Sequence, residues 1–254
     1  MKKYWIIGLI LFAVLILTDL TLGQQPSTKL PFPKIGIDVG TADSPGDISV
    51  TLQILLLMTV LSLAPSIMIM TTSYLRIIIV FHFLKTALGT QSMPPSQLLA
   101  GVALFITFFV MAPTWSKVND DALKPLMDGN ISVDSAYSKG IEPIRQFMFK
   151  NVRDEDLELF LGLATLEKPN NRQEVPTFIL VPSFALSEMR AGFIIGFFLF
   201  IPFLMVDMIV SSILMSMGMM MLPPMLVSLP FKILLFILVD GWNLIVGSLV
   251  RSFA

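Results

Sequence analysis

Apolar and polar positions divide the chain into long blocks and do not alternate at short range. A charged segment, Lys117–Glu174, separates two pairs of apolar runs, which cover Ile48–Tyr74, Gln97–Ala112, Ser183–Met221 and Phe231–Val250. Long apolar runs favour helices in a membrane or a protein assembly, because a helix satisfies its own backbone polar groups. The pattern predicts an all-α, membrane-associated fold of helical hairpins with a small helical insert.

The first 47 residues differ from the rest. Lys2 and Lys3 precede an uncharged apolar core at Trp5–Leu17, and small residues follow it. This order is typical of a secretory signal peptide, which we expect at residues 1–23; the alternative is a retained N-terminal anchor. Residues 24–47 hold prolines, glycines and aspartates without a period, which predicts an extended linker or arm.

Residues 48–113 are expected to form the first hairpin. Its first apolar run is followed by Arg76 and Lys85 and then by the sequence LGTQSMPPSQ, whose glycine and prolines break a helix. The second run is short for a membrane span and is expected to end at Pro113. The two runs therefore predict a hairpin with a positively charged tip.

Residues 114–177 are expected to form a polar helical domain. Three acidic residues start the sequence DEDLELFLGLATLEKP, as the helix dipole favours, and a proline follows it. The acidic cluster is therefore interpreted as a solvated helix start and not as a catalytic or cation site. A preceding helix is expected over Ile141–Asn151, with Ile144, Phe147 and Met148 facing inward. The apolar face of the second helix consists of Leu157, Phe160, Leu161 and Ala164.

Residues 178–254 are expected to form the second hairpin, and it contains charges within apolar runs. An ionisable group costs about 2.5–3.5 kcal/mol in lipid, so such groups usually face protein or water. We predict subunit assembly or charge pairing for these residues and for the two basic residues of the first hairpin; for Lys232 the alternative is a long side chain that reaches the surface. The set is Arg76, Lys85, Glu188, Arg190, Asp207, Lys232 and Asp240.

The sequence SMGMMMLPPM links the two apolar runs of the second hairpin. Methionine side chains are unbranched and polarizable, so a cluster of them can form a soft apolar surface that refits around its neighbours. Such a cluster could seal a channel, although methionines more often fill gaps in a core. The two prolines that follow must interrupt the helix.

Composition narrows the function classes. Of 254 residues, 55% are hydrophobic and 14% are charged, and the net charge is -1, while the mean hydropathy of +0.81 is typical of a membrane protein. The sequence has no cysteine and a single histidine, His82. These counts exclude a cysteine nucleophile and a histidine cluster for zinc. With no P-loop motif either, we expect no enzyme, no cofactor and no metal site.

Two stretches carry a resemblance to a known family. RIIIVFHFLKTALGTQSMPPSQLLAGVALFITFFVMAP at Arg76–Pro113 and IPFLMVDMIVSSILMSMGMMMLPPMLVSLPFKILLFILVDGWNLIVGSLV at Ile201–Val250 resemble the signature blocks of the FliP family of flagellar type III export-gate proteins. The resemblance includes SEMR at Ser187–Arg190 and is looser before Ile48 and in the middle of the polar domain.

The resemblance implies a homo-oligomeric subunit that joins FliQ-like and FliR-like subunits in a helical export gate, through which unfolded flagellar proteins pass. It implies a bacterial inner membrane location in the flagellar basal body. It further implies that Glu188 supports subunit association, with Arg190 a weaker candidate. In the family the methionine-rich loop lines the constriction, which corresponds here to Met219, Met220 and Met221, preceded by Met215 and Met217.

Charge bias gives an expected orientation. If the signal peptide is removed outside, the mature N-terminus and the polar domain lie on the periplasmic or outer side, and the basic tip and the methionine turn lie inside. Alternatives are an injectisome homologue and a transporter of small molecules or ions. A transporter predicts an internal repeat, which the two apolar blocks do not show convincingly.

Overall fold

The computed structural model describes residues 45–90, 93–164, 169, 171–219 and 221–253, and all regular elements in these ranges are helices. This confirms the all-α class. The predicted signal peptide and most of the predicted linker lie outside the described residues. The helices are α2 (Pro45–Thr71), α3 (Tyr74–Leu88), α4 (Ser96–Val118), the π-helical turn η1 (Asn119–Leu123), α5 (Lys124–Met127), α6 (Val133–Asn151), α7 (Asp154–Leu163), the 3-10 turn η2 (Arg172–Glu174), α8 (Thr177–Ser216), α9 (Pro224–Leu238) and α10 (Gly241–Arg251).

Several helices are long and apolar enough to cross a membrane. Three described segments qualify, Leu52–Thr71, Ser96–Met127 and Thr177–Ser216, and α9 with α10 would add a fourth if this pair, bent by 62°, forms one span. No residue in the apolar window of the first segment is buried. The membrane-associated class is therefore confirmed, and these surfaces need lipid or protein neighbours.

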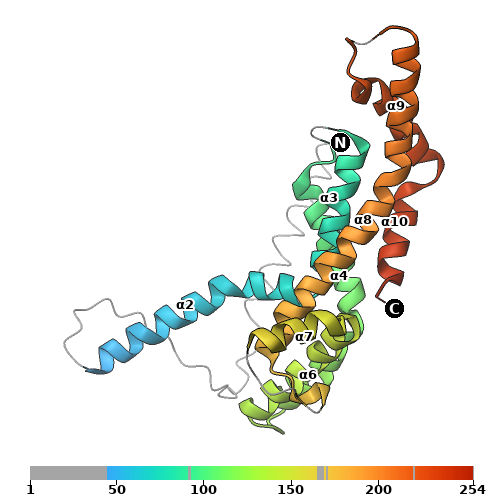
Figure 1. The fold of residues 1–254 in the computed structure, drawn as a ribbon. Coiled ribbons are helices and arrows are strands. Elements are labelled where there is room, and N and C mark those ends of the chain that lie inside the picture. Colours follow the sequence, from blue (N-terminus) through green and yellow to red (C-terminus); the bar gives the residue numbers. More distant parts are fainter. Residues whose placement is uncertain (1–44, 91–92, 165–168, 170, 220, 254) are drawn as a thin grey trace, which may run out of the picture. The chain divides into compact units, whose positions relative to one another are not determined.

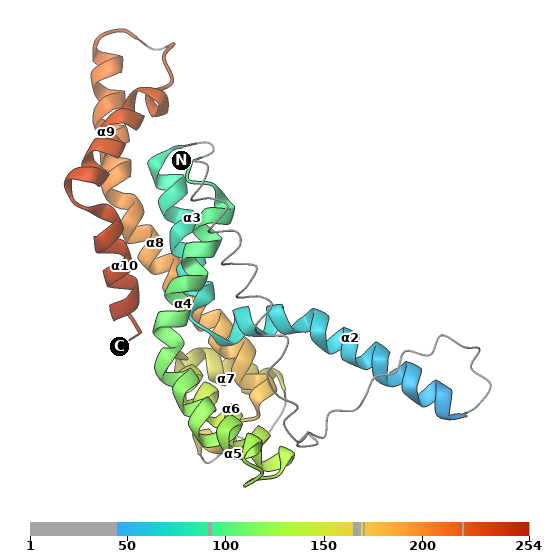
Figure 2. The ribbon, with the colours of Figure 1, turned by 180° about the vertical axis from the view of Figure 1, so that it is seen from behind.

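The first hairpin differs from the prediction. Its arms are α3 and α4, which lie side by side (Figure 2), because the preceding helix already ends at Thr71. At that end the hydroxyl of Thr72 donates to the carbonyl of Met68 at 2.7 Å, a local bond that competes with the continuing helix. Arg76 thus lies in the first turn of α3, far from the turn between the arms. Its predicted position at the tip was wrong, whereas Lys85, in the last turn of α3, lies near the tip.

Pro113 does not end the second arm, as had been predicted. Helix α4 continues through it to Val118 and passes into η1 and α5, which makes one helical segment of 32 residues whose first part is apolar. A proline removes one N–H donor, but leaving the helix would expose several backbone groups in apolar surroundings at a greater cost. The α4 helix therefore crosses the boundary proposed between the hairpin and the polar domain.

The polar domain has its core between α6, α7 and the first turns of α8. The predicted inward residues of α6 and α7 lie in or against one cluster, which confirms both apolar faces. The acidic start of α7 holds specific contacts. Asp154 pairs with Arg172 at 2.9 Å and Glu155 with Arg153 at 2.8 Å. Asp156 is not solvated, because it is buried and accepts a hydrogen bond from Ser187 of α8 at 2.7 Å.

Helix α8 extends from the polar domain toward the methionine loop, and α3 packs along it in parallel (Figure 1). With 40 residues it is about 60 Å long. Two glycines, Gly192 and Gly196, let α3 approach: a Cβ atom on Gly192 would lie 3.0 Å from Ile79, and one on Gly196 would lie 2.5 Å from the ring of Phe83. This glycine spacing is a known signal for close helix packing in apolar segments.

We predict that Gly196→Ala destabilises the fold by about 1–3 kcal/mol, because the new methyl group would overlap Phe83, whose own Cβ lies 2.9 Å away. The matched control is Gly101→Ala in α4, where a Cβ atom meets nothing within 4 Å. There the gain in helix propensity should leave stability unchanged or raise it by up to about 1 kcal/mol. Thermal unfolding in detergent, followed by tryptophan fluorescence, compares them; equal melting temperatures would contradict the packing argument.

Candidate functional site

The methionine loop begins where α8 ends at Ser216. Gly218 has a φ of 75°, and its N–H donates to the carbonyl of Met215 at 3.0 Å. The N–H of Met219 donates to the carbonyl of Leu214, also at 3.0 Å. These two bonds form a Schellman motif, which requires a residue in the left-handed region and so favours glycine. The local sequence therefore stops the helix, and Pro224 at the first turn of α9 starts the next one.

The methionines of this loop are exposed within the chain. Met221 is 99% exposed, and Met215, Met217 and Met219 are 63%, 68% and 40% exposed. Met220 lies outside the described residues. Since large apolar side chains in a group rarely remain in contact with water, this loop needs lipid or protein neighbours outside the chain. Within this chain the loop is thus an exposed apolar surface, and its described methionines are not part of the core.

A buried polar network near the methionine loop joins α9 to α8 and α3. The Nζ atom of Lys232 is 2.6 Å from an oxygen of Asp207 in α8 and donates to the carbonyl of Ala87 in α3 at 3.1 Å. The hydroxyl of Ser228 donates to the other oxygen of Asp207 at 2.5 Å. Lys232 is only 2% exposed. This network joins three helices, and its ammonium group also stabilises the carbonyl end of α3.

A second network joins Arg76 to Glu188 in a bidentate pair, with Nε 2.9 Å from Oε2 and Nη2 bonded to Oε1. Atom Nη1 of Arg76 donates to the carbonyl of Ser252 at 3.0 Å and to its hydroxyl at 2.9 Å. The guanidinium carbon lies 3.8 Å from the centre of the Phe253 ring. A planar guanidinium suits both contacts. Arg76 thus ties α3 and α8 to the segment after α10.

The other predicted charges behave differently. Lys85 donates a hydrogen bond to the hydroxyl of Ser96 at 3.0 Å and so joins the two arms of the first hairpin at its tip. Arg190 and Asp240 are exposed, and neither forms an ion pair with any described residue. Asp240 lies at the break between α9 and α10, with a φ of 50°. The structure therefore pairs four of the predicted charges within the chain and leaves Arg190 and Asp240 to any external partners.

Some residues of these networks were missed from the sequence. Ser228 precedes Lys232 by four positions, and this spacing on one helix face could have indicated it. Ser252 and Phe253 follow the last helix, and no sequence pattern connects them with Arg76. Among the described residues, no group of three or more His, Cys, Asp or Glu side chains could hold a metal ion.

The comparisons with known proteins agree with one another. A family model described as "FliP family" matches residues 57–249. The chain is 56% identical over 217 residues to the flagellar biosynthetic protein FliP of Bacillus subtilis, covering 85% of this chain and 98% of that protein. It is 45% identical over 238 residues to the FliP protein of Caulobacter vibrioides, with 94% and 89% covered. It is 44% identical over 232 residues to that of Treponema pallidum, with 91% and 85% covered. A match over this length and at this identity shows that the chain belongs to the FliP family.

Proposed function

We propose that the chain is a core subunit of the flagellar type III export gate. In this proposal several copies assemble with FliQ-like and FliR-like subunits in the bacterial inner membrane, with the polar domain on the outer side. Family membership supports the flagellar role, because the similar proteins bear the name flagellar biosynthetic protein. Assembly is supported by the exposed apolar faces of the long helices, which need neighbours.

The observation that carries the proposal is the exposed methionine loop at the end of α8. The Schellman motif and the starting proline of α9 fix where the loop begins and ends, and the Lys232 network joins α9 to α8 nearby. In a ring of several copies, Met219, Met220 and Met221 would meet at the channel axis. Close apolar packing would exclude ions and water, and flexible thioethers would yield to a passing polypeptide of any sequence.

The same arrangement implies passive conduction. The sequence has no P-loop motif, so the energy for export is proposed to come from other components of the apparatus. The chain contributes the conduit and its seal, and the ion pairs hold the helices that carry the seal. No catalytic step is proposed for any of its side chains.

We predict that replacing Met219, Met220 and Met221 together with alanine makes the assembled gate leak ions without reducing assembly. Truncation removes the thioethers that fill the constriction but leaves the Gly218 turn intact. Conductance of the purified complex in planar bilayers measures the effect, and native gels measure assembly. The control variant replaces three other exposed methionines, Met189, Met205 and Met208 of α8, with alanine; they are 41%, 56% and 67% exposed. A gate assembled from this variant should stay closed. A closed gate in the first variant, or equal leakage in both, would refute the seal.

A further inference from the structure

Helix α10 contributes few side chains to the core of the chain. Of its 11 residues only Gly241 and Leu249 are buried, and its middle reaches the core through the half-buried Ile245 and Val246. An apolar cavity of about 470 Å³ lies between α10, α8 and α9. A helix of this length is marginal by itself in water, and an element with few buried side chains opens more easily than the rest. The position of α10 therefore depends on how its two ends are held.

Tight apolar packing holds the first end of α10. A Cβ atom on Gly241 would lie 2.2 Å from the ring of Phe236 in α9. The ring of Trp242 meets the rings of Phe236 and Phe81 edge-on, with centres 5.4 and 6.3 Å apart. The preceding Asp240 forms the 62° bend between α9 and α10. This end is fixed by its close contacts, and the bend beside it can act as a hinge.

Mixed polar and aromatic contacts hold the other end, through Ser252 and Phe253, which we call the latch segment. Arg76 of α3 donates to the carbonyl and the hydroxyl of Ser252 and lies over the ring of Phe253. This ring also stacks on that of Phe147 in α6, with centres 6.1 Å apart. The Nζ atom of Lys150 in α6 donates to the carbonyl of Phe253 at 3.1 Å. Phe253 is therefore only 6% exposed, although α10 itself is largely open.

Two cations from other helices thus meet the carbonyl end of α10. Arg76 comes from α3 and Lys150 from α6. The last carbonyls of a helix carry partial negative charge and have no partner within the helix, so cationic donors stabilise them. Since α6 belongs to the polar domain, this domain supplies part of the cap that holds α10.

We propose that the latch segment is a reversible latch through which the polar domain holds α10 closed. When it is released, α10 turns away about the bend at Asp240 while the pair of α3 and α8 stays folded. Because α10 follows α9, which begins at the methionine loop, the latch connects the polar domain with the arm that carries this loop. The proposal is independent of the export-gate role, since it concerns the docking of α10 within one chain.

Hydrogen exchange of the full chain in detergent, followed by mass spectrometry, tests the latch. Phe253→Ala should raise the exchange rate of the α10 amides on the order of 100-fold, because the docked state loses a buried ring, and should leave α3 and α8 as protected as before. Val250→Ala is the matched control. Its side chain lies in the last turn of α10 but is 39% exposed, so the exchange of α10 should stay unchanged.

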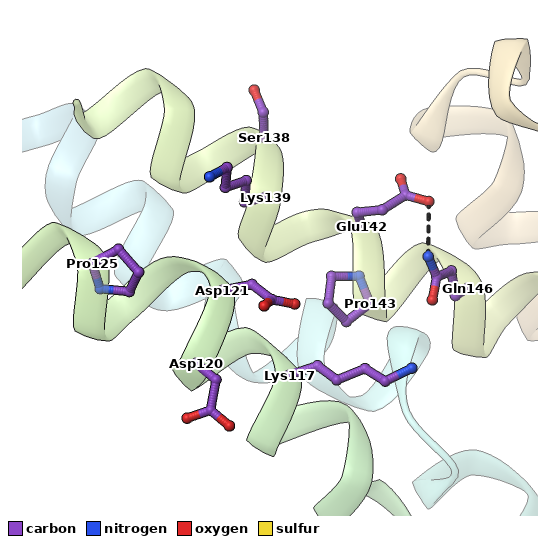
Figure 3. Close-up of a pocket in the computed structure, with 9 residues that line it drawn as sticks. All are labelled: Lys117, Asp120, Asp121, Pro125, Ser138, Lys139, Glu142, Pro143 and Gln146. Atoms are coloured by element: carbon purple, nitrogen blue, oxygen red, sulfur yellow. Dashed lines mark hydrogen bonds between the residues drawn. The ribbon is translucent and has the colours of Figure 1, made fainter. Parts of the chain in front are cut away.

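A second pair of variants tests the contribution of the polar domain. Lys150→Met keeps the apolar stem and removes one ammonium hydrogen bond, so the α10 amides should exchange about 5-fold faster. In the Phe253→Ala background the same change should add nothing, because α10 is already released. The control is Lys139→Met. Lys139 is an exposed lysine earlier in α6, where it lines an open cleft (Figure 3), and its replacement should leave α10 unchanged.

Three outcomes would overturn the latch. Equal loss of protection in α3, α8 and α10 on Phe253→Ala would make Phe253 an ordinary core residue. Unchanged exchange of α10 in that variant would show that other contacts hold the helix. A full 5-fold rise from Lys150→Met in the Phe253→Ala background would show that the two contacts act separately. If Phe253→Ala does not fold, Lys150→Met decides, because it removes a single contact of an exposed side chain; unchanged exchange of α10 there would refute the role of the polar domain.

Discussion

Replacing Glu188 with alanine is expected to destabilise the folded chain by about 3–5 kcal/mol, the largest effect among the variants considered. The Glu188 side chain is fully buried and Arg76 is only 6% exposed. Removing the carboxylate leaves a buried guanidinium whose remaining partners among the described residues are Ser252 and the Phe253 ring. The loss of stability comes from the desolvation of an unpaired charge, and this penalty is larger than the net stabilisation that the ion pair contributes.

Thermal unfolding of the purified chain measures this effect, and two variants serve as controls. Arg190→Ala lies two positions away on the same helix but is exposed, and it should change stability by no more than about 0.5 kcal/mol. Arg76→Met combined with Glu188→Leu removes both charges and should recover much of the lost stability. If Glu188→Ala melts like the wild type and only lowers the yield of the multi-subunit complex, Glu188 acts between subunits and not within the chain.

Replacing Lys232 with methionine is expected to cost about 3 kcal/mol. Methionine retains much of the apolar stem but removes the ammonium group that bridges Asp207 and the carbonyl of Ala87. Asp207 would keep only Ser228 as a described partner, and its partial exposure, 22% for the side chain, places the effect below that of Glu188. Because this network joins α3, α8 and α9, its loss should also loosen the helices on either side of the methionine loop.

Hydrogen exchange of α9 and thermal unfolding measure both consequences. Lys85→Met is the matched control, since Lys85 lies in the last turn of α3, close to the carbonyl that Lys232 contacts. Its side chain forms one described hydrogen bond, to Ser96, which contributes about 1 kcal/mol. Combining Lys232→Met with Asp207→Asn should restore part of the stability, because no unpaired carboxylate remains. Equal effects of Lys85→Met and Lys232→Met would show that the buried network contributes nothing specific.

The candidate site could be predicted from the sequence only in part. Charges inside apolar runs indicate pairing, since lipid and protein interiors penalise unpaired ions. The partners could not be read from spacing, because Arg76 and Glu188 are 112 positions apart and Lys232 meets Ala87 across 145 positions. Contact with other subunits stays a prediction for all seven charges, Glu188 included, and only Arg190 and Asp240 are exposed without an ion pair to a described residue.

The sequence by itself determined the helical class and a few helix ends, because these depend on local chemistry. Gly218 and the two prolines stop and restart the helices around the methionine loop, and the acidic residues mark the start of α7. Only the tertiary structure decided that α3 is an arm of the first hairpin, that α4 passes through Pro113, and that glycines at 192 and 196 admit α3. Those outcomes depend on energies between segments far apart in the chain, where packing and burial override the local preference of a proline or a threonine. The methionine loop combines both: its ends are local, and its exposure depends on how α8 and α9 pack.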